Sequence, residues 1–180
     1  MTEVLFSSES VTSGHPDKLC DAISDAIVDA CLSIDNNARV AVETCVKGKE
    51  DKGLIVLAGE VSLVGEAPDY EAIARAAGAS IGYVSHGIGM DATSTDLCDV
   101  QVHITTQSKD IAQGVNQDGL DQGAGDQGMM FGYACDETEG FEELKGRFFP
   151  LAAALSQRLT RRLTTVREEG ILTWARPDGK

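Results

Sequence analysis

The chain has 180 residues, and its 29 acidic side chains outnumber its 15 basic ones, which gives a formal charge of −14. A surface this acidic repels nucleic acid and anionic membranes, so we expect neither as a partner. No apolar run approaches the ~20 residues of a membrane span, and no secretory signal is visible. The five cysteines form no CxxC pair and have mostly apolar neighbours, so we expect buried thiols in a reducing cytoplasm.

The first quarter of the chain predicts a strand followed by a helix. Residues 3–8 have the pattern of a short strand, and Pro16 suits the first turn of a helix that ends at Asn36 and Asn37. Apolar side chains recur on one face of this helix: Leu19, Ile23, Ile27, Cys31 and Ile34. Such a stripe indicates that the helix packs against a core.

The next segments predict a sheet covered by helices. The apolar segments 38–46 and 54–63 are joined by a polar linker with two glycines, which predicts a β-hairpin. A second helix is expected over residues 68–83 and a further strand over 98–106. The natural arrangement is an α+β fold, with an antiparallel sheet and its helices packed on one face.

The second half of the chain is predicted to begin another module. Residues 107–122 are polar and aperiodic, which indicates a mobile loop, and an apolar strand is expected over 128–134. A helix then runs from about Phe149 to Gly170, and the last ten residues read as a strand entering a turn. We therefore divide the chain into a first module (1–106), a mobile loop (107–122) and the beginning of a truncated second module (123–180).

Two motifs carry residue types suited to chemistry. In the segment SSESVTSGHPDK, His15 and Asp17 lie where a loop enters a helix. A histidine there can donate to a phosphate oxygen and an aspartate can hold Mg²⁺, although an isolated His-Pro-Asp is more often an ordinary capped helix start. In GAGDQGMMFGY, Asp126 is the only acid, so it is either a turn residue or a carboxylate that stabilises a developing positive charge.

Together these two motifs resemble those of the methionine adenosyltransferases (S-adenosylmethionine synthetases), and the resemblance extends from about Val4 to Lys180. It implies the formation of S-adenosylmethionine from ATP and L-methionine, with release of phosphate and pyrophosphate. Members of that family are about twice as long and contain three similar α+β modules. The resemblance therefore implies that this chain corresponds to their N-terminal half.

The resemblance also implies roles for individual residues. It places His15, Asp178, Gly179 and Lys180 at ATP, Asp17 at Mg²⁺, Glu43 at K⁺, Glu60 and Gln107 at L-methionine, and Asp126 beside the substrates. The residues alone leave simpler interpretations open. The two glutamates interrupt apolar strands and can lie on the wet face of a sheet, and RPDGK at the C-terminus is typical of a turn.

The same resemblance raises the question of completeness. The family's other phosphate-binding residues come from its second half, so we expect this chain alone to make no S-adenosylmethionine at a meaningful rate. Two hypotheses remain: part of an active synthetase, or an inactive half-enzyme that binds a nucleotide or a partner chain. We further expect a homodimer or homotetramer formed through the sheet with Glu43 and Glu60, with a second chain that supplies the missing half as a further candidate partner.

Overall fold

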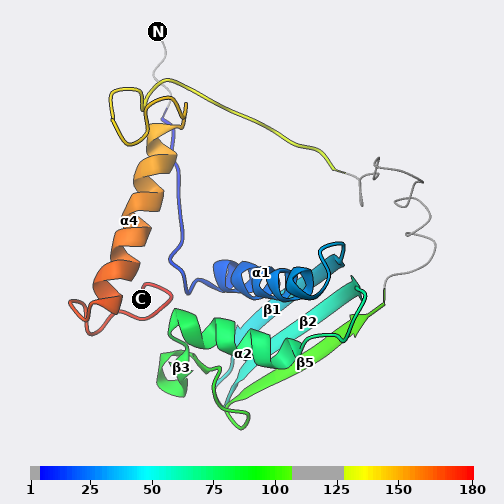
Figure 1. Ribbon diagram of the computed structural model, residues 1–180. Helices are drawn as coiled ribbons and strands as arrows, with labels where there is room; N and C mark the ends of the chain where they lie inside the picture. Colours follow the sequence, from blue (N-terminus) through cyan, green and yellow to red (C-terminus); the bar gives the residue numbers. More distant parts are fainter. Residues whose placement is uncertain (1–4, 107–127) are drawn as a thin grey trace, which may run out of the picture. The chain divides into compact units, whose positions relative to one another are not determined.

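The computed structural model describes residues 5–106 and 128–180, which belong to two compact units (Figure 1). One unit is Pro16–Gly128, and the other combines Met1–His15 with Met129–Lys180. Residues 10–14 thus contact the C-terminal part of the chain, whereas the modules predicted from the sequence remain a prediction. Among the described residues, no helix has the length and apolar character needed to cross a membrane.

The Pro16–Gly128 unit contains two helices on a small sheet. Its elements are α1 (Pro16–Ile34), β1 (Arg39–Gly48), β2 (Gly53–Ser62), α2 (Tyr70–Ile81), β3 (Val84–Ser85), the 3₁₀ helix η1 (His86–Ile88), β4 (Met90–Asp91) and β5 (Cys98–Thr105). β1 and β2 form an antiparallel hairpin in which Gly48 pairs with Gly53. The predicted hairpin, the two helices and the strand at 98–106 are therefore confirmed.

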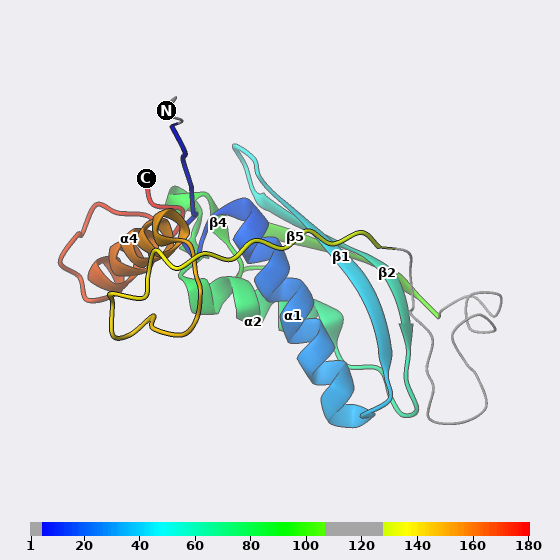
Figure 2. The same cartoon turned by 90° about the horizontal axis from the view of Figure 1, so that it is seen from above.

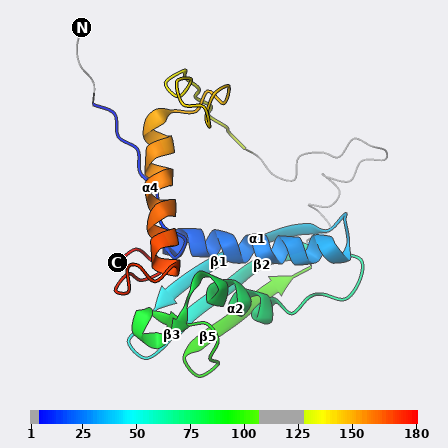
Figure 3. The ribbon, with the colours of Figure 1, turned by 60° about the vertical axis from the view of Figure 1, so that its left-hand side comes forward.

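The sheet is mixed, with strand order β1-β2-β5. The prediction of an antiparallel sheet is wrong for β5, which pairs with β2 in parallel. Parallel neighbours need a long crossover connection, and α2 provides it between β2 and β5. Figures 2 and 3 show α1 and α2 on the same face of the sheet, so the α+β class is confirmed.

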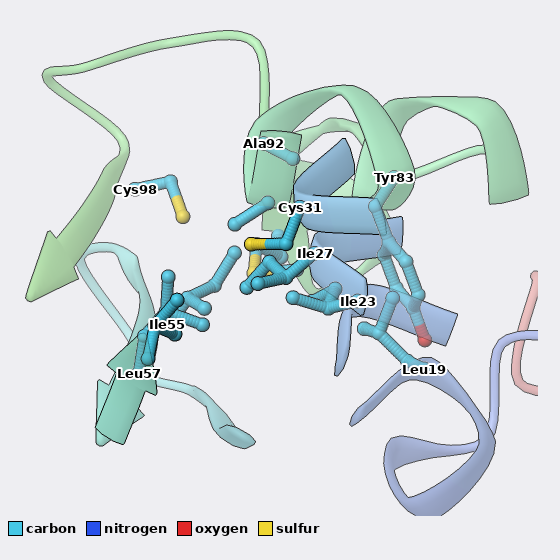
Figure 4. Packing of buried hydrophobic residues seen from close by; sticks show 12 residues of the cluster. Leu19, Ile23, Ile27, Cys31, Ile55, Leu57, Tyr83, Ala92 and Cys98 are labelled. Atoms are coloured by element: carbon cyan, nitrogen blue, oxygen red, sulfur yellow. The ribbon is translucent and has the colours of Figure 1, made fainter. Parts of the chain in front are cut away.

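The core lies between this helical layer and the central strand. Figure 4 shows Ile23, Ile27 and Cys31 of α1 on the side that faces Ile55 and Leu57 of β2, and Leu19 beside Tyr83; all of these side chains are buried. Burial raises the pKa of the Cys31 and Cys98 thiols, which keeps them protonated near neutral pH. The expectation of buried thiols holds for these two cysteines and is wrong for Cys45, which is exposed on β1.

Arg75 of α2 joins the helix to the chain segment before β5. Its side chain is only 15% exposed. The guanidinium donates to the carbonyl oxygens of Ala92, Ser94 and Cys98 at 3.2, 3.3 and 3.0 Å. It also donates to Glu71 Oε1 at 2.8 Å. One side chain therefore satisfies two carbonyl groups of the irregular segment before β5 and one at the start of β5.

We expect Arg75→Met to lower the free energy of unfolding by about 1–3 kcal/mol, because carbonyl groups would lose their donors inside the fold. Urea denaturation followed by circular dichroism measures this change. Arg162→Met is the matched control, since that side chain is 64% exposed and its ion pair is weak. Equal stability of the two variants would contradict the role given to Arg75.

In the other unit, α4 (Leu151–Glu168) is the only helix among the described residues. The Glu137 carboxylate accepts a hydrogen bond from the Leu151 amide at 3.0 Å and so caps the first turn. At the other end, the amides of Gly170 and Ile171 bind the carbonyls of Arg167 and Val166, each at 3.0 Å. The predicted helix and its glycine end are confirmed.

Three strands predicted near this unit are wrong. Residues 5–8, 128–134 and 171–180 form no strand in the structure. An apolar strand at 128–134 would be buried in a core, yet Met130 is 96% exposed and Phe131 is 89% exposed. An apolar run predicts burial, but a strand also needs a partner in the ladder, and within the described residues this segment has none.

Candidate functional site

The segment 5–15 runs alongside α4 and ends against the C-terminal residues (Figures 1 and 3). The hydroxyls of Ser10 and Thr160 are hydrogen-bonded at 3.1 Å. Further along, the Thr12 hydroxyl and the Gly14 amide both donate to the Pro177 carbonyl oxygen at 3.0 Å. This contact, which we call the 12–14/176–180 junction, brings together residues 165 positions apart in the sequence.

Two glycines allow the close approach at this junction. A Cβ atom on Gly14 would lie 2.4 Å from the Pro177 carbonyl carbon, so no larger residue fits without moving the backbone. Gly179 has φ +82° and faces Thr12, whose Cγ2 would lie 3.0 Å from an added Cβ. Both positions therefore depend on the missing side chain.

Residues 176–180 form a turn that presents one carboxylate. The Gly179 amide donates to the Arg176 carbonyl at 2.9 Å, with Pro177 at the second position, so the turn predicted for RPDGK is confirmed. Asp178 has a side chain only 11% exposed. Its Oδ2 lies 3.4 Å from Arg176 Nη2 and 3.7 Å from Lys180 Nζ. Lys180, at 81% exposure, keeps its ammonium group open to a ligand.

Two buried polar atoms of the junction, Ser13 Oγ and Arg176 Nε, lack a hydrogen-bond partner within the described part of the chain. Both are donors, and a buried donor without a partner requires an explanation such as a ligand or an ordered water. Phosphate oxygens are acceptors of the matching kind.

His15 lies at the end of the same unit, directly after Gly14, and its amide donates to the Thr12 carbonyl at 3.1 Å. Its side chain is half-buried. Asp17 follows two residues later in the first turn of α1, with an exposed side chain. His15 is the next residue after Gly14, which contacts Pro177, and Pro177 is the residue before Asp178. The roles of His15, Asp17 and Asp178 remain predictions.

Glu43 and Glu60 lie together on the outer face of the sheet, opposite the helices. Glu43 pairs with Ala58, and Glu60 pairs with Ala41 on the neighbouring strand. The register also places His103 of β5 beside Ala58 in the same row as Glu43. A cavity of about 510 Å³ at the β1 edge of the sheet is lined by Glu43, Ala58 and Gly59, and also by Val28 of α1. The wet-face orientation left open by the sequence is the observed one.

Comparison with protein families identifies both parts of the chain. Residues 3–109 match the S-adenosylmethionine synthetase N-terminal domain, and residues 121–180 match the central domain of the same enzyme. The chain belongs to the S-adenosylmethionine synthetase family. Members of this family are methionine adenosyltransferases, which are transferases, and the two matches follow one another in the family's order. The resemblance read from the two motifs is thereby confirmed.

S-adenosylmethionine synthetases use divalent and monovalent cations. Within the described residues, no group of three or more histidine, cysteine, aspartate or glutamate side chains could hold a metal ion. Mg²⁺ commonly takes only one or two protein carboxylates and completes its shell with substrate phosphates and water. Asp17 alone is therefore compatible with Mg²⁺ that arrives with a nucleotide, and Glu43 with a monovalent cation.

Two predicted site residues, Gln107 and Asp126, lie outside the described residues. Two residues at the junction were missed from the sequence, Thr12 and Arg176. Thr12 is 7% exposed and binds across the junction, but a threonine in a polar loop gives no signal of burial. Arg176 belongs to the RPDGK segment, where only the last three residues were singled out.

Proposed function

We propose that the protein acts as a methionine adenosyltransferase, forming S-adenosylmethionine from ATP and L-methionine with release of phosphate and pyrophosphate. The observation that carries this proposal is the 12–14/176–180 junction. Two distant segments, each given an ATP-binding role by the family resemblance, are held together by hydrogen bonds of the Pro177 carbonyl. A reducing cytoplasm suits the protein, since its five cysteines are all free.

The residues of the junction would act on the triphosphate. In the proposed reaction the methionine sulfur attacks C5′ of ATP, and the triphosphate leaves with its charge. His15 donates a hydrogen bond to the phosphates, and Lys180 adds a positive charge at the turn with Asp178 and Gly179. Asp17 holds Mg²⁺, which would supply the charge neutralisation that a chain of net charge −14 cannot give alone.

The outer face of the sheet would serve the other substrate. Glu60 binds the ammonium group of L-methionine, and Glu43 lies beside K⁺. Gln107 and Asp126 complete the proposed site, Gln107 near L-methionine and Asp126 near the sulfur as its positive charge develops. Glu43 and Glu60 lie on the same face of the sheet, which supports the proposal that K⁺ and the ammonium group of L-methionine bind on this face.

The function is tested by assaying the full-length natural enzyme that carries this sequence. It is incubated with ATP, L-methionine, Mg²⁺ and K⁺, and S-adenosylmethionine is quantified by mass spectrometry. We expect product only when both substrates are present, together with phosphate and pyrophosphate. Hydrolysis of ATP without S-adenosylmethionine would contradict the proposal.

A second function, that of a nucleotide-binding or interaction subunit, is favoured by the exposed apolar side chains of the Met129–Lys180 region. The most exposed of these large side chains are Met129, Met130, Phe131, Tyr133, Leu159 and Trp174. Exposed apolar surface of this kind marks contact with another chain. Two results together would identify this second function. The chain would bind ATP saturably without forming S-adenosylmethionine, and addition of a partner chain would produce synthetase activity.

We expect the protein to form a homodimer or homotetramer through the outer sheet face. Around Glu43 and Glu60 this face has the apolar residues Ala41, Leu54, Val56 and Ala58, and the helices of its own unit lie on the other side. Light scattering at tens of micromolar measures the mass. Val56→Lys should reduce it to that of a monomer, whereas Val64→Lys, at a site 84% exposed, should leave it unchanged. A monomeric wild type would contradict the interface.

A further inference from the structure

We propose that Thr12 is a positioning residue for the nucleotide, acting through the turn at 176–180. The inference rests on the proposed function, because it takes Asp178, Gly179 and Lys180 as ATP-binding residues. Thr12 touches none of the reacting atoms in this account. Its side chain fixes where the turn lies, and the turn contacts the nucleotide.

The contacts at Thr12 are specific to its hydroxyl group. Thr12 Oγ1 donates to the Pro177 carbonyl at 3.0 Å, and the residue is 7% exposed. The same carbonyl accepts the Gly14 amide at 3.0 Å, so both lone pairs of this oxygen are used. The Thr12 methyl group faces Gly179 on the other side of the turn. Thr12 therefore contacts the turn at two points.

Hydrogen bonds from Thr12 and Gly14 join the turn to the rest of the unit, and the side chain of Leu163 also packs near Gly179. Further hydrogen bonds of the turn are internal: Gly179 to Arg176 at 2.9 Å, and Arg176 to Lys180 at 2.7 Å. The ion pairs of Asp178 also join members of the same turn. Bonds inside the turn preserve its shape but do not hold it in place. The contacts with the rest of the unit supply that placement, and small errors in the position of binding groups weaken ligand binding.

The test compares Thr12→Val with Thr12→Ser in the full-length natural enzyme. Valine keeps the volume of threonine and removes the hydroxyl, whereas serine keeps the hydroxyl and removes the methyl group. We expect Thr12→Val to raise KM for ATP, and Kd for ATP measured by calorimetry, by about three- to tenfold. KM for L-methionine should stay unchanged, and Thr12→Ser should restore most of the ATP affinity.

Hydrogen exchange gives a readout that does not involve ATP. The amides of Gly14 and Gly179 should exchange faster in Thr12→Val than in the wild type, because the junction opens more often. Unchanged exchange and unchanged ATP affinity in Thr12→Val would overturn the inference. Equal rises in both KM values would also overturn it, since they would indicate general damage to the fold.

The outcomes separate this inference from the proposed function. If the wild type binds ATP but makes no S-adenosylmethionine, the proposed function fails while the effect of Thr12→Val on ATP affinity still decides the inference. If the wild type makes product and Thr12→Val binds ATP equally well, only the inference fails. If the wild type binds no ATP, both fail.

Discussion

Replacing His15 with alanine in the full-length natural enzyme is expected to slow S-adenosylmethionine formation by about 10²–10³-fold. The variant lacks the imidazole, so the triphosphate would lose a hydrogen-bond donor at the place where negative charge accumulates as the bond to C5′ breaks. His15→Gln keeps a donor at a similar reach and should recover part of the rate. Steady-state assays with saturating substrates measure kcat for all three proteins.

Asp17→Asn should reduce the rate to a similar extent and raise the Mg²⁺ concentration needed for half-maximal activity, because an amide is a weaker ligand for Mg²⁺ than a carboxylate. Asp21→Asn is the matched control, since Asp21 lies one turn further along α1 and is also exposed. Near wild-type turnover of both His15→Ala and Asp17→Asn would leave these residues as an ordinary helix start.

Replacing Glu60 with glutamine is expected to raise KM for L-methionine by about 10–100-fold, as the loss of a charge-assisted hydrogen bond costs about 1.5–3 kcal/mol. The change keeps the shape of the side chain and removes only its charge. KM for ATP should remain close to the wild-type value, because ATP is assigned to the junction. Steady-state assays with each substrate varied separately measure both constants.

Two further variants sharpen this result. Glu43→Gln should change the dependence on K⁺ and leave KM for L-methionine close to normal. Glu50→Gln, in the exposed link between β1 and β2, should change neither constant. A rise in KM for L-methionine with Glu43→Gln but not with Glu60→Gln would contradict the assignment of the two acids.

Much of the Pro16–Gly128 unit was predictable because its elements have regular periods. The apolar stripe of α1 and the two strands around a polar linker gave helix and hairpin correctly. The direction of β5 was not predictable from its own residues, because its alternation of apolar and polar residues is the pattern usual in antiparallel sheets, yet β5 pairs with β2 in parallel. The segment 128–134 failed for another reason, because its burial depends on a partner strand that no local pattern identifies.

The candidate site was predictable only where motifs marked it. The resemblance selected His15 and the turn at 178–180, but it could not show that they approach each other within one unit. At that approach Thr12 and Gly14 both donate to the Pro177 carbonyl, which lies 165 positions from Thr12 in the sequence. No periodic pattern or fixed residue spacing in the sequence marks a hydrogen bond between distant loops, so only the structure reveals it.

A crystal structure of the full-length natural enzyme with the imidodiphosphate analogue of ATP tests most directly whether ATP binds at the 12–14/176–180 junction. We expect the phosphates of the analogue to contact His15 and residues 178–180, with the Thr12 hydroxyl still bound to the Pro177 carbonyl. An analogue bound away from the 12–14/176–180 junction, with His15 and Lys180 making no contact to it, would contradict the account.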